Sequence, residues 1–333
     1  MTDSSSKMLR KNLAETQPRY PEETRSNTCL ILQYHRVALL CHDPLQLAVE
    51  PYKFERQMEY LRDSFNVISM EEMKQHLETA TPFRAKTVVV TFDCGYADVL
   101  YTAKEVLERC EVFATVFCSS ANIIKRGQFW WDLLDDYLIA NRFRGQLEIE
   151  IDGQLLKWSL MTQLDRFRTY DDLYSILSNK IPSEQKRIVD QITQSLDLQA
   201  EELDNHRTMS ADELKKLEEG RLITIGGHTH NYVKLSSLPK WQQAEEVSKN
   251  KAVLEEVLGH EIEYFSYPFG CGDSYACTET IEILRDNGFS LACGDCHGKV
   301  SLAEEKNYYD LPRIKVGNWK PFTFYRSLKR FFG

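Results

Sequence analysis

The stretch TVVVTFDCGY, from Thr87 to Tyr96, carries the strongest indication of the fold. Its first six residues, Thr87–Phe92, are apolar or β-branched, as in a strand that is buried on both faces. A carboxylate and a thiol follow at Asp93 and Cys94, and the chain then reaches Gly95. Functional groups gather at the carboxyl ends of strands in parallel α/β folds, so this stretch predicts a parallel sheet with a candidate site at its edge.

Helical patterns alternate with further strands of the same character. The clearest helix start is Ser210, where Glu213 completes a capping box, and Gly220 provides the stop. This alternation predicts an α/β fold whose largely parallel sheet closes into a barrel. The other predicted buried strands are Cys29–Tyr34, Val112–Cys118, Leu222–Gly226, Tyr264–Tyr267 and Phe289–Ala292.

The region from about 127 to 208 interrupts this alternation. It begins with an apolar-aromatic helix, continues with a hairpin that turns at Asp152-Gly153, and ends with two more helices. No flexible Gly/Ser/Pro linker bounds the region. We therefore expect a mostly helical insertion packed on the barrel rather than a free domain.

Composition restricts the partners and the location. The chain has 333 residues with a net charge of −9, which disfavours nucleic acid as a partner. No run approaches the ~20 apolar residues of a membrane-spanning helix. Residues 1–27 are polar with no apolar signal region, which predicts a disordered lead-in before a domain at 28–333 and a cytoplasmic protein.

The cysteines agree with a reducing compartment. They number nine, an odd count in a chain large enough to form an apolar core, so we expect reduced thiols. One alternative is a structural zinc site made by Cys271, Cys277, Cys293 and Cys296, although buried or surface thiols explain the same residues.

Two other predicted strands also end in candidate groups. His228 and His230 follow one strand, a pattern that suggests a metal ligand, although at this spacing only one of them is expected to enter a shared site. The stretch from Phe265 to Gly270 runs from a strand into a tight turn, whose N–H groups can face an oxyanion. The structural alternatives are a helix-capping Asp93 beside a buried Cys94, a structural histidine, and a plain Pro-Gly loop.

These three segments, in this order, resemble the polysaccharide deacetylase family, the NodB-like carbohydrate esterases, with its motifs T-F-D-D-G-Y, H-T-x-x-H and aromatic-proline. YHRV at Tyr34–Val37, FWWD at Phe129–Asp132 and LPRI at Leu311–Ile314, with Asn318-Trp319 beyond, resemble motifs of a subgroup associated with bacterial surface-glycan synthesis. The resemblance runs from about residue 30 to 325. It implies a distorted parallel α/β barrel and hydrolytic removal of an acetyl group from a sugar.

The resemblance also implies a site. Family members hold a divalent metal with one Asp and two His, and a neighbouring Asp accepts the proton of the attacking water. Asp93 falls on that base and His228 on the first histidine ligand. Cys94 and Tyr232 fall on the other two ligand positions, so two of three family ligands are replaced. Tyr267 falls in the motif whose turn contacts the oxyanion. His35, Trp131, Phe269 and Arg313 are expected to line the substrate cleft.

These departures leave three hypotheses open. The first is a metal-dependent deacetylase of an N-acetylated sugar or glycan precursor, with zinc held by His228 and a Cys94 thiolate. The second is a catalytically impaired relative, a pseudoenzyme that binds glycan or a partner enzyme through the same cleft. The third is a metal-free hydrolase in which Cys94 is the nucleophile and His228 or His35 the base.

Overall fold

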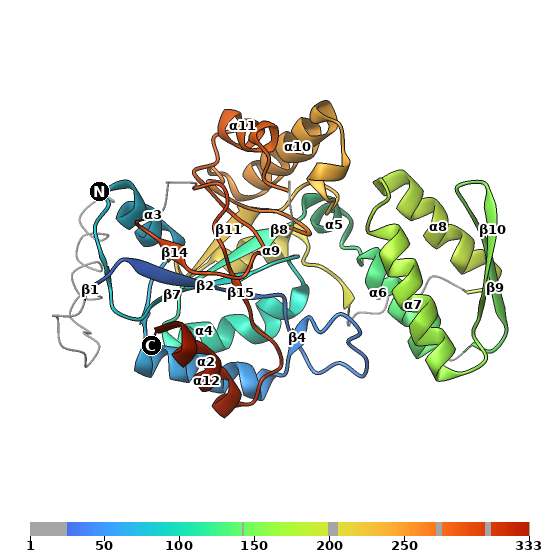
Figure 1. Cartoon of the computed structure of the whole chain (residues 1–333), viewed down its shortest axis with the longest axis horizontal. Coiled ribbons are helices and arrows are strands. Elements are labelled where there is room, and N and C mark those ends of the chain that lie inside the picture. Colours follow the sequence, from blue (N-terminus) through green and yellow to red (C-terminus); the bar gives the residue numbers. More distant parts are fainter. Residues whose placement is uncertain (1–24, 142, 199–205, 271–274, 304–307, 333) are drawn as a thin grey trace.

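The computed structural model describes residues 25–141, 143–198, 206–270, 275–303 and 308–332 (Figure 1). The predicted lead-in therefore lies outside the described residues, except for its last three positions. Within those, Arg25–Ser26 (β1) pairs antiparallel with Phe83–Arg84 (β6). The described structure thus starts slightly before the predicted boundary at residue 28.

A sheet of nine strands, counted over the described residues, forms the centre of the molecule. Its main path runs in the order β13, β12, β11, β8, β7, β2, β14, and every pair along it is parallel except that of β2 with β14. The six predicted strands are confirmed, with shifts of up to two residues at their ends. The strands on this path are Thr28–Tyr34 (β2), Thr87–Phe92 (β7), Ala114–Cys118 (β8), Ile223–Gly227 (β11), Tyr264–Ser266 (β12), Leu291–Cys293 (β13) and Val300–Ser301 (β14).

The last part of the chain joins the two ends of this sheet. Ile314–Lys315 (β15) pairs parallel with β2, and three residues earlier Leu311 forms a single parallel bridge to Cys293 in β13. Asn66–Val67 (β5) adds a further parallel pair on β7. The curled sheet is thereby closed by an irregular segment rather than by a full strand, and the predicted distorted barrel is confirmed.

Helices cover the outside of the sheet (Figure 1). The capping box at Ser210 is confirmed, because its backbone N–H donates to Glu213 Oε2 at 2.8 Å and its hydroxyl accepts from Glu213 N at 3.3 Å. None of the described helices is long and apolar enough to cross a membrane. The covering helices are Pro51–Ser64 (α2), Met70–Glu78 (α3), Val99–Ala103 (η1), Lys104–Cys110 (α4), Ser120–Lys125 (α5), Ala211–Glu218 (α9), Leu235–Ser237 (η4), Lys240–Leu258 (α10), Thr278–Asp286 (α11) and Pro321–Phe332 (α12).

The insertion lies at one end of the molecule and has an apolar cluster of its own (Figure 1). Its hairpin turns where predicted, with φ of 54° at Asp152 and 74° at Gly153, as a two-residue turn requires. An antiparallel bridge between Gln128 and Arg207 joins the start and the end of the region. Its elements are Trp130–Leu134 (α6), Asp135–Ala140 (η2), Gln146–Ile151 (β9), Gln154–Ser159 (β10), Gln163–Leu177 (α7) and Pro182–Ser195 (α8).

Between β2 and α2 the chain makes a loop that faces the insertion. Arg36–Val37 (β3) and Ala48–Val49 (β4) pair parallel at its two ends. Leu45 and Leu47, near the end of this loop, contribute to the cavities described below.

Candidate functional site

The predicted site residues come from the carboxyl ends of three strands of the sheet, of which β11 and β12 are neighbours and β7 is separated from β11 by β8. Asp93 follows β7, His228 follows β11 and Tyr267 follows β12. The turn after β7 is tight, with φ of 79° at Cys94 and 77° at Gly95. A Cβ at Gly95 would lie 2.9 Å from the Cys118 sulfur, so only glycine fits here. Cys94 itself adopts a backbone conformation that is uncommon for a non-glycine residue.

Asp93 is buried and fully hydrogen-bonded. Arg313 donates from Nη1 to Oδ1 at 2.8 Å and from Nη2 to Oδ2 at 2.7 Å. Gln33 Nε2 adds a bond to Oδ2 at 2.9 Å. Burial opposes ionisation of Asp93, but the Arg313 guanidinium outweighs it and holds the pKa of the carboxyl well below its ordinary value. The carboxylate is therefore charged at neutral pH.

The same guanidinium reaches a second carboxylate. Arg313 Nη2 donates to Asp295 Oδ1 at 2.6 Å, and Gln33 Nε2 donates to the same oxygen at 2.7 Å. One buried arginine thus links Asp93 to Asp295. Arg313 is buried and is not among the residues that line the cavity described below, whereas the resemblance placed it in the substrate cleft.

Cys94 and Tyr232, which the resemblance assigns to the two altered ligand positions, are hydrogen-bonded to each other. The Cys94 thiol donates to the Tyr232 hydroxyl at 3.5 Å. Burial and the nearby Asp93 carboxylate raise the pKa of the Cys94 thiol well above its ordinary value. Burial, followed by the Cys94 sulfur, raises the pKa of the Tyr232 phenol in the same way. Both groups are neutral, which also disfavours Cys94 as a nucleophile.

Tyr232 is held by aromatic side chains. Its ring centroid lies 4.7 Å from that of Trp131, 5.0 Å from Phe129 and 5.4 Å from Phe269, each in edge-to-face geometry. The His228 ring is 4.8 Å away. Such contacts stabilise aromatic pairs by about 0.5–1.5 kcal/mol each beyond their burial. The phenol ring is thus part of a packed aromatic cluster.

His228 retains the features of a ligand. Its Nδ1–H donates to the carbonyl oxygen of Ser266 at 2.7 Å, which fixes the ring and leaves the Nε2 lone pair free. This buried Nε2 has no hydrogen-bond partner among the described residues. Burial lowers the pKa of His228, so the imidazole is neutral.

The donors here do not fit the family's metal as they stand. One neutral imidazole is in place, but the thiol and the phenol would both have to lose protons beside the Asp93 charge. No group of three His, Cys, Asp or Glu side chains in the described part of the chain is arranged to hold a metal ion. Cys271 of the predicted four-cysteine site lies outside the described residues.

A cavity of about 290 Å³ opens beside this centre. Of the residues that the resemblance assigned to the substrate cleft, His35, Trp131 and Phe269 line it, and so does Tyr232. Burial lowers the pKa of His35 to about 3, so it is neutral as well. The lining residues that the sequence did not indicate are Gln33, Leu45, Leu47, Tyr174, Asp295 and Lys315.

Two residues of the predicted motifs point elsewhere. The Tyr267 hydroxyl donates to the carbonyl oxygen of Tyr309 at 2.8 Å and its side chain is buried. Part of the turn after it, residues 271–274, lies outside the described residues. His230 Nδ1 is 2.8 Å from the Ser120 hydroxyl, so this second histidine forms a hydrogen bond with Ser120.

Solved structures show where this fold occurs. The chain is similar to the deacetylase PplD of Streptococcus pyogenes, with 16% identity, a TM-score of 0.58, and coverage of 90% of this chain and 98% of that one. It is also similar to IcaB from Ammonifex degensii, with 20% identity, a TM-score of 0.58, and coverage of 93% and 99%. It is similar as well to BC0361, a polysaccharide deacetylase from Bacillus cereus, with 16% identity, a TM-score of 0.55, and coverage of 90% of this chain and 69% of that one.

Comparison of sequences gives a narrower match. None of the curated proteins matches this chain. The family model for polysaccharide deacetylase matches residues 168–291, a range that includes His228, Tyr232 and Tyr267. Over these residues the chain is similar in sequence to the polysaccharide deacetylase family, and the solved structures show that it shares the fold of such deacetylases.

Proposed function

We propose that this chain binds an N-acetylated sugar unit of a glycan in the 290 Å³ cavity without using the family's metal-dependent hydrolysis. The similarity of residues 168–291 to polysaccharide deacetylases supports the sugar as ligand. The observation that carries the rest is the hydrogen bond between Cys94 and Tyr232, which joins two neutral groups at two family ligand positions.

The lining of the cavity suits a sugar. Trp131, Tyr174 and Phe269 offer aromatic surface for the apolar faces of a pyranose ring and for an acetyl methyl group. Gln33, with Asp295 and Lys315, offers donors and acceptors for hydroxyl and amide groups. A few polar groups set in an apolar wall are typical of small-ligand sites, and this volume is at the small end of their range.

Deacetylation is the second candidate function. It is favoured by the charged Asp93, at the position of the family's base, and by the free Nε2 of His228. In this case Asp93 would accept a proton from water as the water attacks the amide carbonyl, releasing acetate and an amine. Its two bonds to Arg313 make Asp93 a weak base, which argues against this candidate.

Two measurements on one protein separate the candidates. Binding of short N-acetylglucosamine oligomers is measured by calorimetry, and acetate release is measured by mass spectrometry with and without added zinc or cobalt. We expect binding without acetate release. Acetate release above that of Asp93→Asn would establish the second candidate, and absence of binding would contradict the proposal.

A matched double variant tests the physical reason. Cys94→Asp combined with Tyr232→His restores the family's ligand types around His228, so it should bind zinc and release acetate from the same oligomers. Each single variant serves as control, because one restored ligand leaves the other position neutral. If the double variant folds and binds zinc but stays inactive, the replaced ligands are not what prevents hydrolysis.

The sequence favours a precursor in the cytoplasm, which stays a prediction. So do the domain boundary at residue 28 and the description of residues 127–208 as an insertion.

A further inference from the structure

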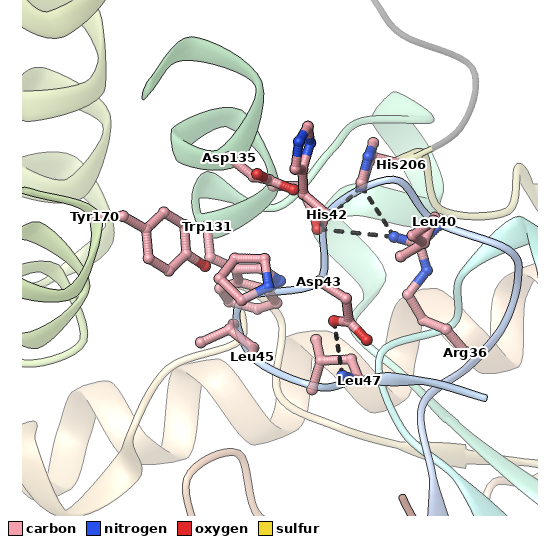
Figure 2. Close-up of a pocket in the computed structure, with 12 residues that line it drawn as sticks. Arg36, Leu40, His42, Asp43, Leu45, Leu47, Trp131, Asp135, Tyr170 and His206 are labelled. Carbon is pink, nitrogen blue, oxygen red and sulfur yellow. Dashed lines mark hydrogen bonds and ion pairs between the residues drawn. The ribbon is translucent and has the colours of Figure 1, made fainter. Parts of the chain in front are cut away.

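A second pocket adjoins the sugar cavity (Figure 2). It lies between the loop after β3 and the start of the insertion, and Leu45, Leu47 and Trp131 line both cavities. Figure 2 shows the Asp135 carboxylate pointing from the insertion towards the loop that carries His42. A ligand that extends past Trp131 from the sugar cavity would reach this pocket.

Three carboxylates line the pocket, and one of them lacks a partner. Asp43 accepts from the backbone N–H groups of Leu47 and Ala48, both at 2.9 Å. Asp132 accepts from the Tyr96 hydroxyl at 2.8 Å. Asp135 is 5% exposed, yet its buried Oδ1 has no hydrogen-bond partner among the described residues. A buried unpaired carboxylate oxygen costs free energy, so it indicates a missing donor.

The positive group nearby is already engaged. Arg36 Nε donates to Asp98 Oδ2 at 2.9 Å, and Arg36 Nη1 donates to His206 Nδ1 at 2.9 Å. Because His206 accepts this bond through a lone pair, it adds no positive charge here. Counting Asp98, the carboxylates outnumber this one cation, and the excess is on the Asp135 side.

The protonation of Asp135 reflects this excess. Burial raises the pKa of its carboxyl to about 7, and the neighbouring Asp136 adds to the shift. Near neutral pH the carboxyl therefore exchanges between a proton and any better-placed cation. An approaching positive group would favour the ionised form.

Size restricts what that cation can be. The pocket has a free volume of about 10 Å³, enough for one group of the size of a water molecule. The described residues hold no arrangement of three side chains that would suit a metal ion. An ammonium group has the right size and charge, and it can donate to several carboxylates at once.

We propose that the pocket of Asp43, Asp132 and Asp135 binds the ammonium group of a de-N-acetylated sugar that neighbours the sugar in the 290 Å³ cavity. The inference rests on the proposed function, because the main cavity must hold the adjoining unit. The preferred ligand is then a partly de-N-acetylated glycan rather than a fully acetylated one.

The test compares two probes by calorimetry at pH 7 and low salt. One is a fully acetylated N-acetylglucosamine tetramer, and the other is the same tetramer with one free amine. We expect the amine-bearing tetramer to bind about tenfold more tightly, as one added charge-assisted contact would give. This preference should weaken at high salt.

Variants locate the effect. Asp135→Asn should reduce the ratio of the two Kd values to near one. Asp136→Asn is the matched control, since it removes a neighbouring charge on the same helix, and Asp136 does not line the pocket. The ratio of the two Kd values in Asp136→Asn should remain close to that of the wild type.

The outcomes separate this inference from the proposed function. Binding of both tetramers with equal affinity contradicts the ammonium site and leaves the sugar cavity supported. A preference for the amine that persists in Asp135→Asn also contradicts the site. If neither tetramer binds, the proposed function fails and this inference fails with it.

Discussion

Two buried aspartates, one at the end of β7 and one at the start of the insertion, have opposite surroundings. Asp93 is 1% exposed and receives three hydrogen bonds, two of them from Arg313. Asp135 is 5% exposed and has one oxygen with no partner among the described residues. The pKa of Asp93 is lowered, whereas that of Asp135 is raised to about 7.

The difference shows that burial alone does not determine the charge of a carboxyl group. Desolvation favours the neutral form of both residues, and at Asp93 the neighbouring groups, with the Arg313 guanidinium first among them, reverse it. A paired carboxylate contributes to the folded structure. An unpaired one remains available to a proton or to a ligand.

The largest expected effect comes from removing the cation beside Asp93, so that this carboxylate lacks a charged partner, as Asp135 does in the described part of the chain. Arg313→Met leaves a buried carboxylate without its two charged bonds, so we expect the free energy of unfolding to fall by about 3–5 kcal/mol. Urea denaturation at pH 7 measures it. Arg313→Lys keeps a charge without the paired geometry and should lose less. A loss below about 1 kcal/mol in Arg313→Met would show that the pair does not stabilise the fold.

Adding a carboxylate without a cation partner next to Asp93 should have the next largest effect on stability. Cys94→Asp tolerates the positive φ somewhat better but adds a buried charge, and we expect a net loss of about 2–4 kcal/mol in metal-free protein. Thermal unfolding with and without zinc measures it. Zinc should restore stability in the double variant with Tyr232→His, as ligand linkage requires. Equal melting temperatures of the double variant in both conditions would argue against a restored site.

Removing the unpaired charge should stabilise the protein. Because the pKa of Asp135 is raised from 3.8 to about 7 on folding, the native state holds the proton more tightly, and stability declines as pH rises from about 4 to about 7 and is then level. Asp135→Asn removes this dependence, so we expect a gain of about 1–2 kcal/mol at pH 8 and a smaller gain at pH 5. Denaturation at the two pH values measures it. A loss at pH 8 would mean that the carboxylate has a partner.

The smallest expected effect comes from removing the neutral side-chain donor to Asp93. Gln33→Leu removes one bond to Asp93 and one to Asp295 but leaves Arg313 in place, so we expect a loss of about 1 kcal/mol. Urea denaturation against wild type checks it. A loss of stability as large as that of Arg313→Met would mean that Gln33 contributes as much to holding Asp93 as Arg313 does.

Much of the fold could be predicted from short segments. The run before Asp93 and the strand before His228 are apolar and β-branched, and each forms the strand expected of it. The capping box at Ser210 and the turn at Asp152-Gly153 also depend on adjacent residues alone. Patterns of this kind act within a few residues, which is why they are visible in a sequence.

The candidate site could be predicted in part. Motif resemblance indicated His35, Trp131 and Phe269, which line the cavity, but it gave no indication of Tyr174 or Asp295. Tyr174 lies on α7 of the insertion, where one aromatic residue in a helical pattern does not differ from a core residue. Asp295 lies between Cys293 and Cys296, a pattern that suggests a structural zinc site instead.

By itself, the sequence determined the order of strands and helices and the presence of Asp93, Cys94 and His228 at strand ends. Only the tertiary structure decided their states. Arg313 reaches Asp93 across 220 residues of chain, and Cys94 meets Tyr232 across 138. No local pattern encodes such meetings, because they depend on how distant strands close the barrel. Charge, pKa and ligand fit follow from those contacts.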